Sequence, residues 1–349
     1  MPNVDFQYVI DLTNAKGAPL GQTPVHPDWT SARHWVRMEA VRQGRVGEGE
    51  IPGAVVVHPV WSASGGRPQV EGFRFEITGG AGDGFFVTAG VEYLQNWAEV
   101  SASALVQSNQ LERGESYRYQ VFAFPEVKGE STQQMELAPF EEPPISFGLT
   151  DRSLNDLGAI SGEEEYPVFF PRQIIGETEE LTEGAGGKET GGLLVGKLFR
   201  DPGQSVIFAE VTAQIPARHV EASETNLAFT SETWSQARSA LRLRKKNETF
   251  LGWWHSHPVK EWCKACPAEK RKKCPLLVDF FSLQDRHLHQ TAFPGAHSIA
   301  LVVNQLASDH QTISLFGWSR GVLSQRKYQV LDPSTTEPKK DPAANEAQK

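Results

Sequence analysis

Hydrophobic and polar residues follow two different periods along the second half of the chain. Apolar runs predict strands at residues 193–199, 206–214, 249–254, 298–303 and 312–318. Trp234, Ala237 and Leu241 share one helical face and predict a helix over residues 231–246. A second helix is predicted over residues 282–292. Strands mixed with two helices indicate an α/β fold in which helices sandwich a mixed sheet.

In the first half of the chain, apolar and polar residues alternate with the period of two that is typical of strands. Phe73, Phe75 and Ile77 alternate with polar residues, and residues 54–57 form a short apolar run. One helix is predicted over residues 30–43. We therefore expect a smaller β-rich accessory domain over residues 1–125.

The remaining boundaries follow from composition. Residues 126–187 are rich in glutamate and predict an acidic linker with short ordered pieces. Residues 188–328 are expected to form the second domain, with an insert at 259–281. Residues 329–349 are polar and predict a disordered tail.

Length and charge narrow the class of protein. A chain of 349 residues can hold two domains, and its net charge of -9 argues against binding nucleic acid through bulk electrostatics. The start of the sequence lacks the pattern of a signal peptide, and no run approaches the roughly 20 apolar residues of a membrane span. We expect a cytoplasmic protein without membrane or nucleic-acid partners.

Two histidines separated by one residue follow the strand predicted over residues 249–254. Alternate side chains of a strand point to the same side, so His255 and His257 project together while Ser256 faces away. Two imidazoles on one side can bind one zinc ion, because bonds from zinc to histidine nitrogen are about 2.0–2.1 Å long. The pair therefore predicts a metal site.

A serine and an aspartate three residues apart begin the next helix. Ser282 suits the N-cap, and Asp285 on the same face is the expected third, anionic ligand. Zinc with three protein ligands keeps a position for water and lowers the pKa of that water to near neutrality. A base must still take and return a proton, and Glu189, just before Gly191 and Gly192, is the candidate.

These residues together resemble the JAB/MPN+/JAMM metalloproteases, which include deubiquitinase-type isopeptidases and bacterial relatives. The resemblance covers residues 188–325 and rests on Glu189 with Thr190-Gly191-Gly192, on His255-x-His257-Pro258 and on Ser282-x-x-Asp285. It implies that His255, His257 and Asp285 hold zinc, that Glu189 is the general acid/base and that Ser282 stabilises the tetrahedral intermediate. The chain departs from the family in one respect, since 24 residues separate His257 from Ser282. This longer insert leaves the choice of substrate in doubt.

The insert holds all three cysteines, Cys263, Cys266 and Cys274, within 12 residues. An odd number so close together is a poor disulfide framework, whereas Cys-x2-Cys favours a second, structural zinc site. The fourth ligand could be His287, His289 or His310. Reduced thiols in a flexible loop are an equally good interpretation, and an iron–sulfur cluster is less favoured. The sequence leaves this choice open.

The resemblance implies a zinc isopeptidase or peptidase that cleaves after the C-terminal tail of a ubiquitin-like protein. The reaction would be deconjugation or precursor processing, in a bacterial ubiquitin-like system whose E1/E2-like proteins are further expected partners. One alternative is a peptidase acting on a sulfur-carrier protein in cysteine or cofactor metabolism. Another is a non-catalytic MPN scaffold, against which the presence of all five site residues counts.

Overall fold

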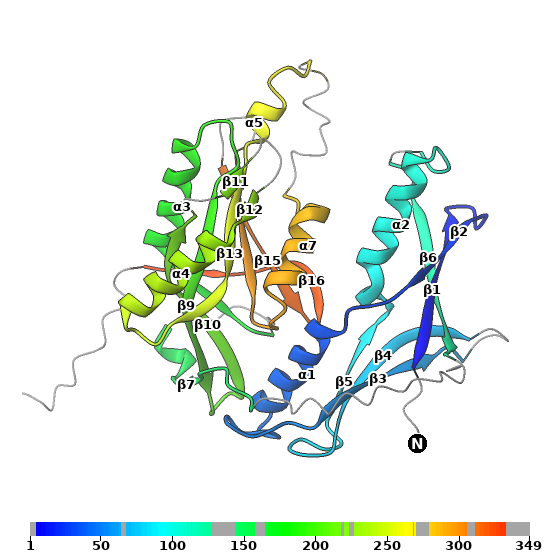
Figure 1. Cartoon of the computed structure of the whole chain (residues 1–349), viewed down its shortest axis with the longest axis horizontal. Helices are drawn as coiled ribbons and strands as arrows, with labels where there is room; N and C mark the ends of the chain where they lie inside the picture. The colour runs from blue at the N-terminus through cyan, green and yellow to red at the C-terminus, as the bar shows by residue number, and fades with distance from the viewer. Residues whose placement is uncertain are drawn as a thin grey trace, which may run out of the picture. The chain divides into compact units, whose positions relative to one another are not determined.

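The chain forms two compact units (Figure 1). The first consists of Met1–Phe147, Ser282–Ala296 and Trp318–Ser324, and the second of Gly148–Phe281, His297–Gly317 and Gln325–Lys349. The computed structural model describes residues 5–63, 68–112, 114–126, 144–157, 165–217, 220–222, 227–267, 269, 279–305 and 311–332. Within these ranges, none of the helices combines the length and the apolar character needed to span a bilayer.

The first unit is built on a six-stranded sheet with the strand order β2-β1-β6-β4-β3, in which β5 also pairs with β4. Its strands are β1 (Phe6–Asn14), β2 (Pro19–Val25), β3 (Ala54–Trp61), β4 (Gln69–Thr78), β5 (Phe86–Gly90) and β6 (Tyr117–Pro125). Its helices are α1 (Thr30–Arg42), η1 (Val91–Leu94), α2 (Gln95–Gln107) and α7 (Leu283–Ala292). The alternating Phe73, Phe75 and Ile77 are all fully buried, as the period-two pattern predicts. The β-rich character of the first half is therefore confirmed.

Helix α2 is an α-helix of this unit that the sequence pattern did not predict. Its buried positions are Ala98, Ser101 and Ala102. Small residues of this kind leave only a weak hydrophobic stripe, so a search for large apolar residues at helical spacing overlooks it.

The second unit is built on a mixed nine-stranded sheet with the strand order β16-β15-β14-β13-β9-β10-β8-β17, in which β7 also pairs with β9. Its strands are β7 (Thr150–Asp151), β8 (Val168–Pro171), β9 (Gly191–Asp201), β10 (Val206–Pro216), β13 (Thr249–His257), β14 (Ile299–Gln305), β15 (Gln311–Ser319), β16 (Val322–Arg326) and β17 (Gln329–Leu331). A separate hairpin pairs β11 (Val220–Ala222) with β12 (Leu227–Phe229). The helices are η2 (Leu154–Leu157), α3 (Arg172–Gly184), α4 (Ser231–Arg244) and α5 (Val259–Trp262).

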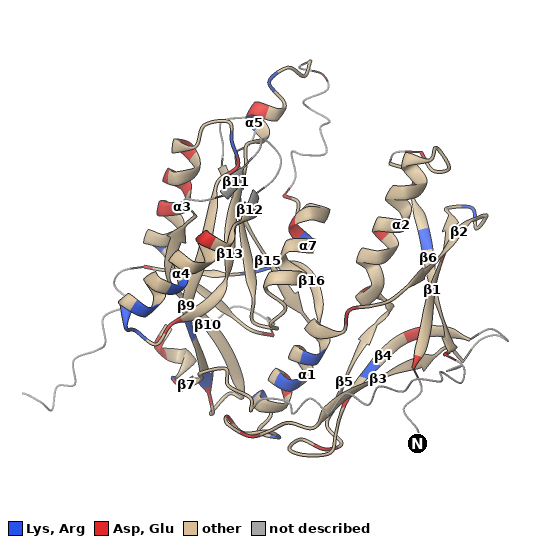
Figure 2. Ribbon diagram, viewed as in Figure 1, with Lys and Arg blue, Asp and Glu red and all other residues tan. Residues whose placement is uncertain are grey.

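Residues 126–187, expected as a linker, contribute elements to this second unit. Strand β8 pairs in parallel with β10, and α3 follows it. The buried positions of α3 are Ile174, Thr178 and Thr182, which lie four residues apart on one face. Acidic residues stand along the rest of the helix (Figure 2), so the glutamates between positions 177 and 183, part of what suggested a solvated connector, belong to an amphipathic helix.

The predicted tail also begins later than expected. Residues 329–331 form β17, which pairs in parallel with β8. Leu331 is buried in a cluster with Phe169, Phe199 and Phe208. Burial of Leu331 and the pairing with β8 therefore keep residues 329–331 in the sheet. Positions 333–349 lie outside the described residues.

A β-bulge in β13 decides which residues share a face of the sheet. The pairing with β9 shifts its register between Phe250 and Gly252. After the shift, Trp254 donates from Nε1 to Gln214 Oε1, whose amide group also contacts Glu177 of α3. On the other face, Phe250 packs against Trp234 of α4. Helices therefore cover both faces of the sheet, which confirms the predicted α/β class.

Candidate metal centre

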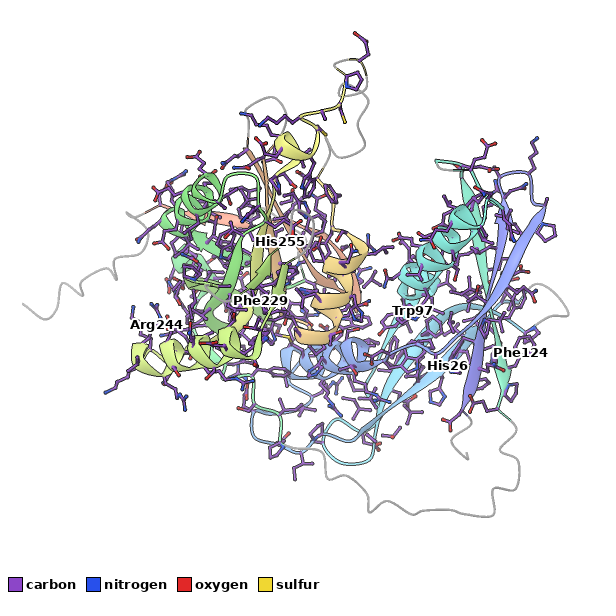
Figure 3. The ribbon with its side chains drawn as sticks, turned by 45° about the horizontal axis from the view of Figure 1, so that its top comes forward. His26, Trp97, Phe124, Phe229, Arg244 and His255 are labelled. Carbon is purple, nitrogen blue, oxygen red and sulfur yellow. The ribbon has the colours of Figure 1, made fainter. Side chains whose placement is uncertain are left out.

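His255 and His257 are the last alternate residues of β13, and their rings turn toward each other. Their Nε2 atoms are 3.0 Å apart, and both side chains are almost completely buried. Ser256 between them directs its hydroxyl elsewhere, accepting a hydrogen bond of 3.0 Å from the backbone N–H of Thr190. The two imidazoles thus present convergent nitrogens from one face of the strand, within the second unit. Figure 3 labels His255.

Aromatic rings stack on the faces of both imidazoles. The ring of Trp253 stacks on His255 with centroids 4.4 Å apart, and the ring of Phe280 stacks on His257 at 4.3 Å. Each pair is within 12° of parallel. Such flat contacts restrict rotation about the side-chain bonds, so the two nitrogens stay aimed at the same point.

Strand pairing brings the segment that follows Glu189 close to the histidines. Gly191 of β9 is opposite His255 of β13 in the antiparallel register. The backbone N–H of Ser256 donates to Thr190 O at 2.8 Å, so the two segments already meet one residue before β9 begins. Glu189, the residue before Thr190, is 6% exposed. Residues opposite each other in an antiparallel pair point to the same side, so an extension of this register by one residue would put the Glu189 carboxylate on the histidine side of the sheet.

Ser282 and Asp285 form a capping box at the start of α7. The Ser282 Oγ accepts from the backbone N–H of Asp285 at 3.1 Å, and Asp285 Oδ2 accepts from the backbone N–H of Ser282 at 2.8 Å. A serine hydroxyl can donate its own hydrogen while its oxygen accepts, and a carboxylate has two accepting oxygens. The capping box therefore engages one oxygen of each side chain.

The donor atoms of His255, His257 and Asp285 all lie within 4.8 Å of one another. Two ligands of one tetrahedral zinc ion are about 3.3 Å apart when each bond is about 2.05 Å. The observed 3.0 Å between the imidazole nitrogens is close to that separation. Two neutral imidazoles and one carboxylate are also a donor set that zinc accepts, so these residues fit the ion.

Two polar residues that the sequence pattern does not single out extend a chain of hydrogen bonds from His257. Asn304 Oδ1 lies 2.9 Å from His257 Nδ1, and Asn304 Nδ2 donates to Asp279 Oδ1 at 2.9 Å. In the sequence, the one sign of this contact is that Asn304 directly follows the apolar run Ile299-Ala300-Leu301-Val302-Val303. In the structure its side chain is 1% exposed. A buried amide needs hydrogen-bond partners, but the sequence does not say which.

The cysteine site proposed from the sequence stays a prediction. Cys263 is buried at the end of α5 and Cys266 is half-buried, whereas Cys274 lies outside the described residues. Of the suggested fourth ligands, His310 is also outside them. His287 is exposed, and His289 is buried beside Phe293 and Trp318.

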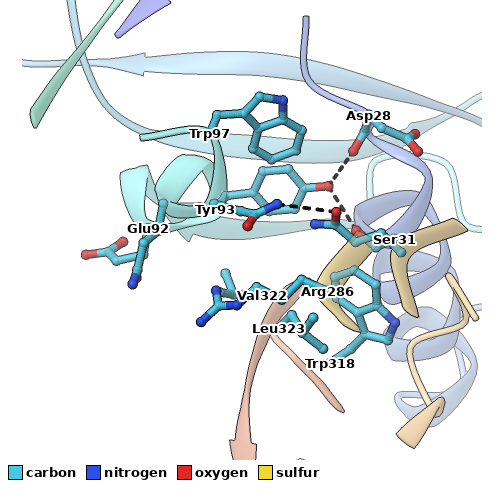
Figure 4. Close-up of a pocket in the computed structure, with 13 residues that line it drawn as sticks. Asp28, Ser31, Glu92, Tyr93, Trp97, Arg286, Trp318, Val322 and Leu323 are labelled. Carbon is cyan, nitrogen blue, oxygen red and sulfur yellow. Dashed lines mark hydrogen bonds between the residues drawn. The ribbon is translucent and has the colours of Figure 1, made fainter. Parts of the chain in front are cut away.

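Residues that line a pocket in the first unit hold elements of the fold together (Figure 4). The hydroxyl of Tyr93 donates to the backbone carbonyl of Asp28 at 2.9 Å and lies 3.0 Å from Ser31 Oγ. Burial raises the pKa of Tyr93 to about 12, so the phenol stays protonated at neutral pH. Its hydrogen bonds tie the start of α1 to η1.

A strand-borne histidine pair beside a helix-start aspartate, on a mixed sheet covered by helices, defines an α/β protein with a candidate metal centre. Residues 174–268 match the family described as JAB1/Mov34/MPN/PAD-1 ubiquitin protease. The match indicates a JAB/MPN-type domain, of the kind found in peptidase and deubiquitinase-like proteins, in this part of the chain. The matched range includes Glu189, His255 and His257 and ends inside the insert, before Ser282 and Asp285.

No curated protein matches the chain. Among solved structures, it is similar to the solution structure of protein DSY2949 from Desulfitobacterium hafniense, with 18% sequence identity and a TM-score of 0.33. That likeness covers 47% of this chain and 92% of the other. At so low a TM-score it carries no argument about fold or function.

Proposed function

We propose that the protein is a zinc-dependent isopeptidase or peptidase that cleaves after the C-terminal tail of a ubiquitin-like protein. The observation that supports this most is the convergence of His255, His257 and Asp285 donor atoms within 4.8 Å, on a JAB/MPN domain. A ubiquitin-like protein or its conjugate is the proposed substrate, and E1/E2-like proteins of the same bacterial system are proposed partners.

Each residue of the site has a proposed role. His255, His257 and Asp285 would hold the ion, which when bound activates a water nucleophile and polarises the scissile carbonyl. Glu189, which is buried, takes the proton of the attacking water and returns it to the leaving amine. Ser282 donates its hydroxyl hydrogen to the carbonyl oxygen as charge develops there.

Two substitutions test this assignment on the full chain. Wild-type protein purified with zinc should contain at least one zinc per chain, measured by plasma mass spectrometry. His257→Ala should lose that zinc, because one of three ligands is gone. Glu189→Gln should keep it and lose at least about 100-fold in turnover, the usual contribution of a general base.

The substrate should be a ubiquitin-like protein with a short C-terminal extension, alongside the same protein joined to a lysine side chain. A sulfur-carrier protein with an extended tail is the comparison substrate for the alternative reading. Cleavage by Glu189→Gln at the wild-type rate would show that the carboxylate has another role. A wild-type chain that holds zinc and cleaves none of the three would favour the scaffold interpretation.

A further inference from the structure

Three polar residues lie side by side across neighbouring strands, next to the candidate metal centre. His257 of β13 pairs with Asn304 of β14 in the parallel register, and Asn304 pairs with Thr312 of β15 in the antiparallel one. Asp279 is the first described residue after the gap in the insert, and it contacts two members of this row. The sheet therefore places these three residues side by side, and Asp279, near the C-terminal end of the insert, bonds to two of them.

The hydrogen bonds of this row have only one consistent direction. Asp279 Oδ1 accepts from Thr312 Oγ1 at 2.7 Å and from Asn304 Nδ2 at 2.9 Å. An ionised carboxylate can only accept, so it fixes the amide nitrogen of Asn304 on its own side. The amide oxygen then faces His257 Nδ1 at 2.9 Å. Because a carbonyl oxygen can only accept, Nδ1 of His257 must carry the hydrogen.

The tautomer of a histidine decides whether it can bind a metal. With the hydrogen on Nδ1, Nε2 of His257 carries the lone pair that a ligand bond uses, and this is the nitrogen that faces His255 at 3.0 Å. If Asn304 turned its amide around, it would present N–H to the ring and favour a hydrogen on Nε2. That second tautomer cannot bind an ion through Nε2.

We propose that Asn304, oriented by Asp279, is a positioning residue that keeps His257 in the Nδ1–H tautomer and so prepares Nε2 for zinc. This inference rests on the proposed function only for the identity of the metal. It also gives the insert a structural role. Its returning end supplies both Asp279 and Phe280, and Phe280 stacks on the same imidazole.

Zinc affinity gives the first readout, through competition with a chromophoric chelator. Removing a hydrogen-bond partner of a metal-binding histidine typically weakens metal affinity by about 10–100-fold. We expect that loss for Asn304→Ala and for Asp279→Ala. Gln305→Ala is the matched control, since Gln305 is the next residue of β14 and donates to Thr182 O at 3.2 Å instead. It should change the affinity by less than about 3-fold, well below the range expected of the positioning residues.

A second substitution of Asn304 separates the hydrogen-bond role from packing. Asn304→Leu keeps about the volume of the side chain without the acceptor, so it should lose zinc affinity as Asn304→Ala does. The double variant Asn304→Asp with Asp279→Asn keeps one amide and one carboxylate and keeps an acceptor beside His257, so it should recover most of that affinity. Asp279 is exposed, so its variants are not expected to unfold the chain. Zinc affinity near wild type in Asn304→Leu, or failure of the swap to bind zinc better than Asn304→Ala, would overturn the inference.

The tautomer gives a second readout that needs neither metal nor activity. Long-range proton–nitrogen NMR on the metal-free chain should show the hydrogen of His257 on Nδ1 in the wild type, and a mixture or the other tautomer in Asn304→Ala. A wild-type hydrogen on Nε2 would overturn the inference. If the wild type binds no zinc and cleaves nothing, the proposed function fails, while the tautomer still decides the role of Asn304.

Discussion

Substitution of Ser282 should separate the two tasks that its hydroxyl performs. As an acceptor, Oγ caps α7 through the 3.1 Å bond from the backbone N–H of Asp285. As a donor, it is assigned to the carbonyl oxygen of the substrate. Loss of a serine N-cap to alanine costs about 1 kcal/mol of stability, and to glycine only a few tenths. Loss of one donor to a developing oxyanion costs about 100- to 1000-fold in turnover.

These magnitudes predict that stability and turnover will not change together. Ser282→Ala should lose about 1 kcal/mol and Ser282→Gly much less, yet both should lose turnover by the same factor of about 100 to 1000. A loss of 1 kcal/mol cannot produce that factor, because a domain with about 5–15 kcal/mol of stability stays folded. Ser282→Thr keeps both the acceptor and the donor, so it is the control that should stay near wild type.

The zinc content of each variant identifies the cause. Asp285 Oδ2 accepts from the backbone N–H of Ser282 at 2.8 Å, and this bond survives any change of the side chain except proline. All three variants should therefore keep zinc. Urea denaturation, zinc analysis and single-turnover cleavage of a ubiquitin-like fusion make the comparison. Turnover within a few-fold of wild type in the alanine and glycine variants would refute the donor role, and a parallel loss of zinc would place the effect on Asp285.

Two further predictions concern the scaffold. A Cβ added at Gly252, whose φ is +156°, would lie 1.7 Å from the carbonyl oxygen of Ile299, so Gly252→Ala should cost about 3 kcal/mol or more in urea denaturation. Gly176→Ala in α3 meets nothing within 4 Å and should instead stabilise by about 0.4–1 kcal/mol; equal effects at both glycines would contradict the steric argument. The hydrogen-bonded Arg244 guanidinium lowers the pKa of Glu248 from its usual 4.5, so Glu248→Gln should cost about 1–3 kcal/mol at pH 7. That difference should be present above pH 4.5 and shrink as the pH falls through the lowered pKa, and a difference that grows in acid would have the wrong sign.

Local patterns determined much of the second half of the chain. The predicted helix over residues 231–246 is α4 (Ser231–Arg244), and the helix expected from Ser282 has that serine as its N-cap. The strand that carries the histidines was also predicted, although it runs on to His257. These features depend on residues within a few positions of one another, where spacing alone decides which side chains share a face.

Pairing between distant segments was decided only in the folded chain. Strand β8 pairs with β17, which lies about 160 residues later in the chain. No local sequence pattern indicates a parallel partner at that distance. The same holds for the contact of Asn304 with the imidazole of His257. The sequence by itself determined which residue types could bind a metal ion. The tertiary structure decided which of them meet, because strand register and hydrogen-bond direction depend on neighbours far away in the chain.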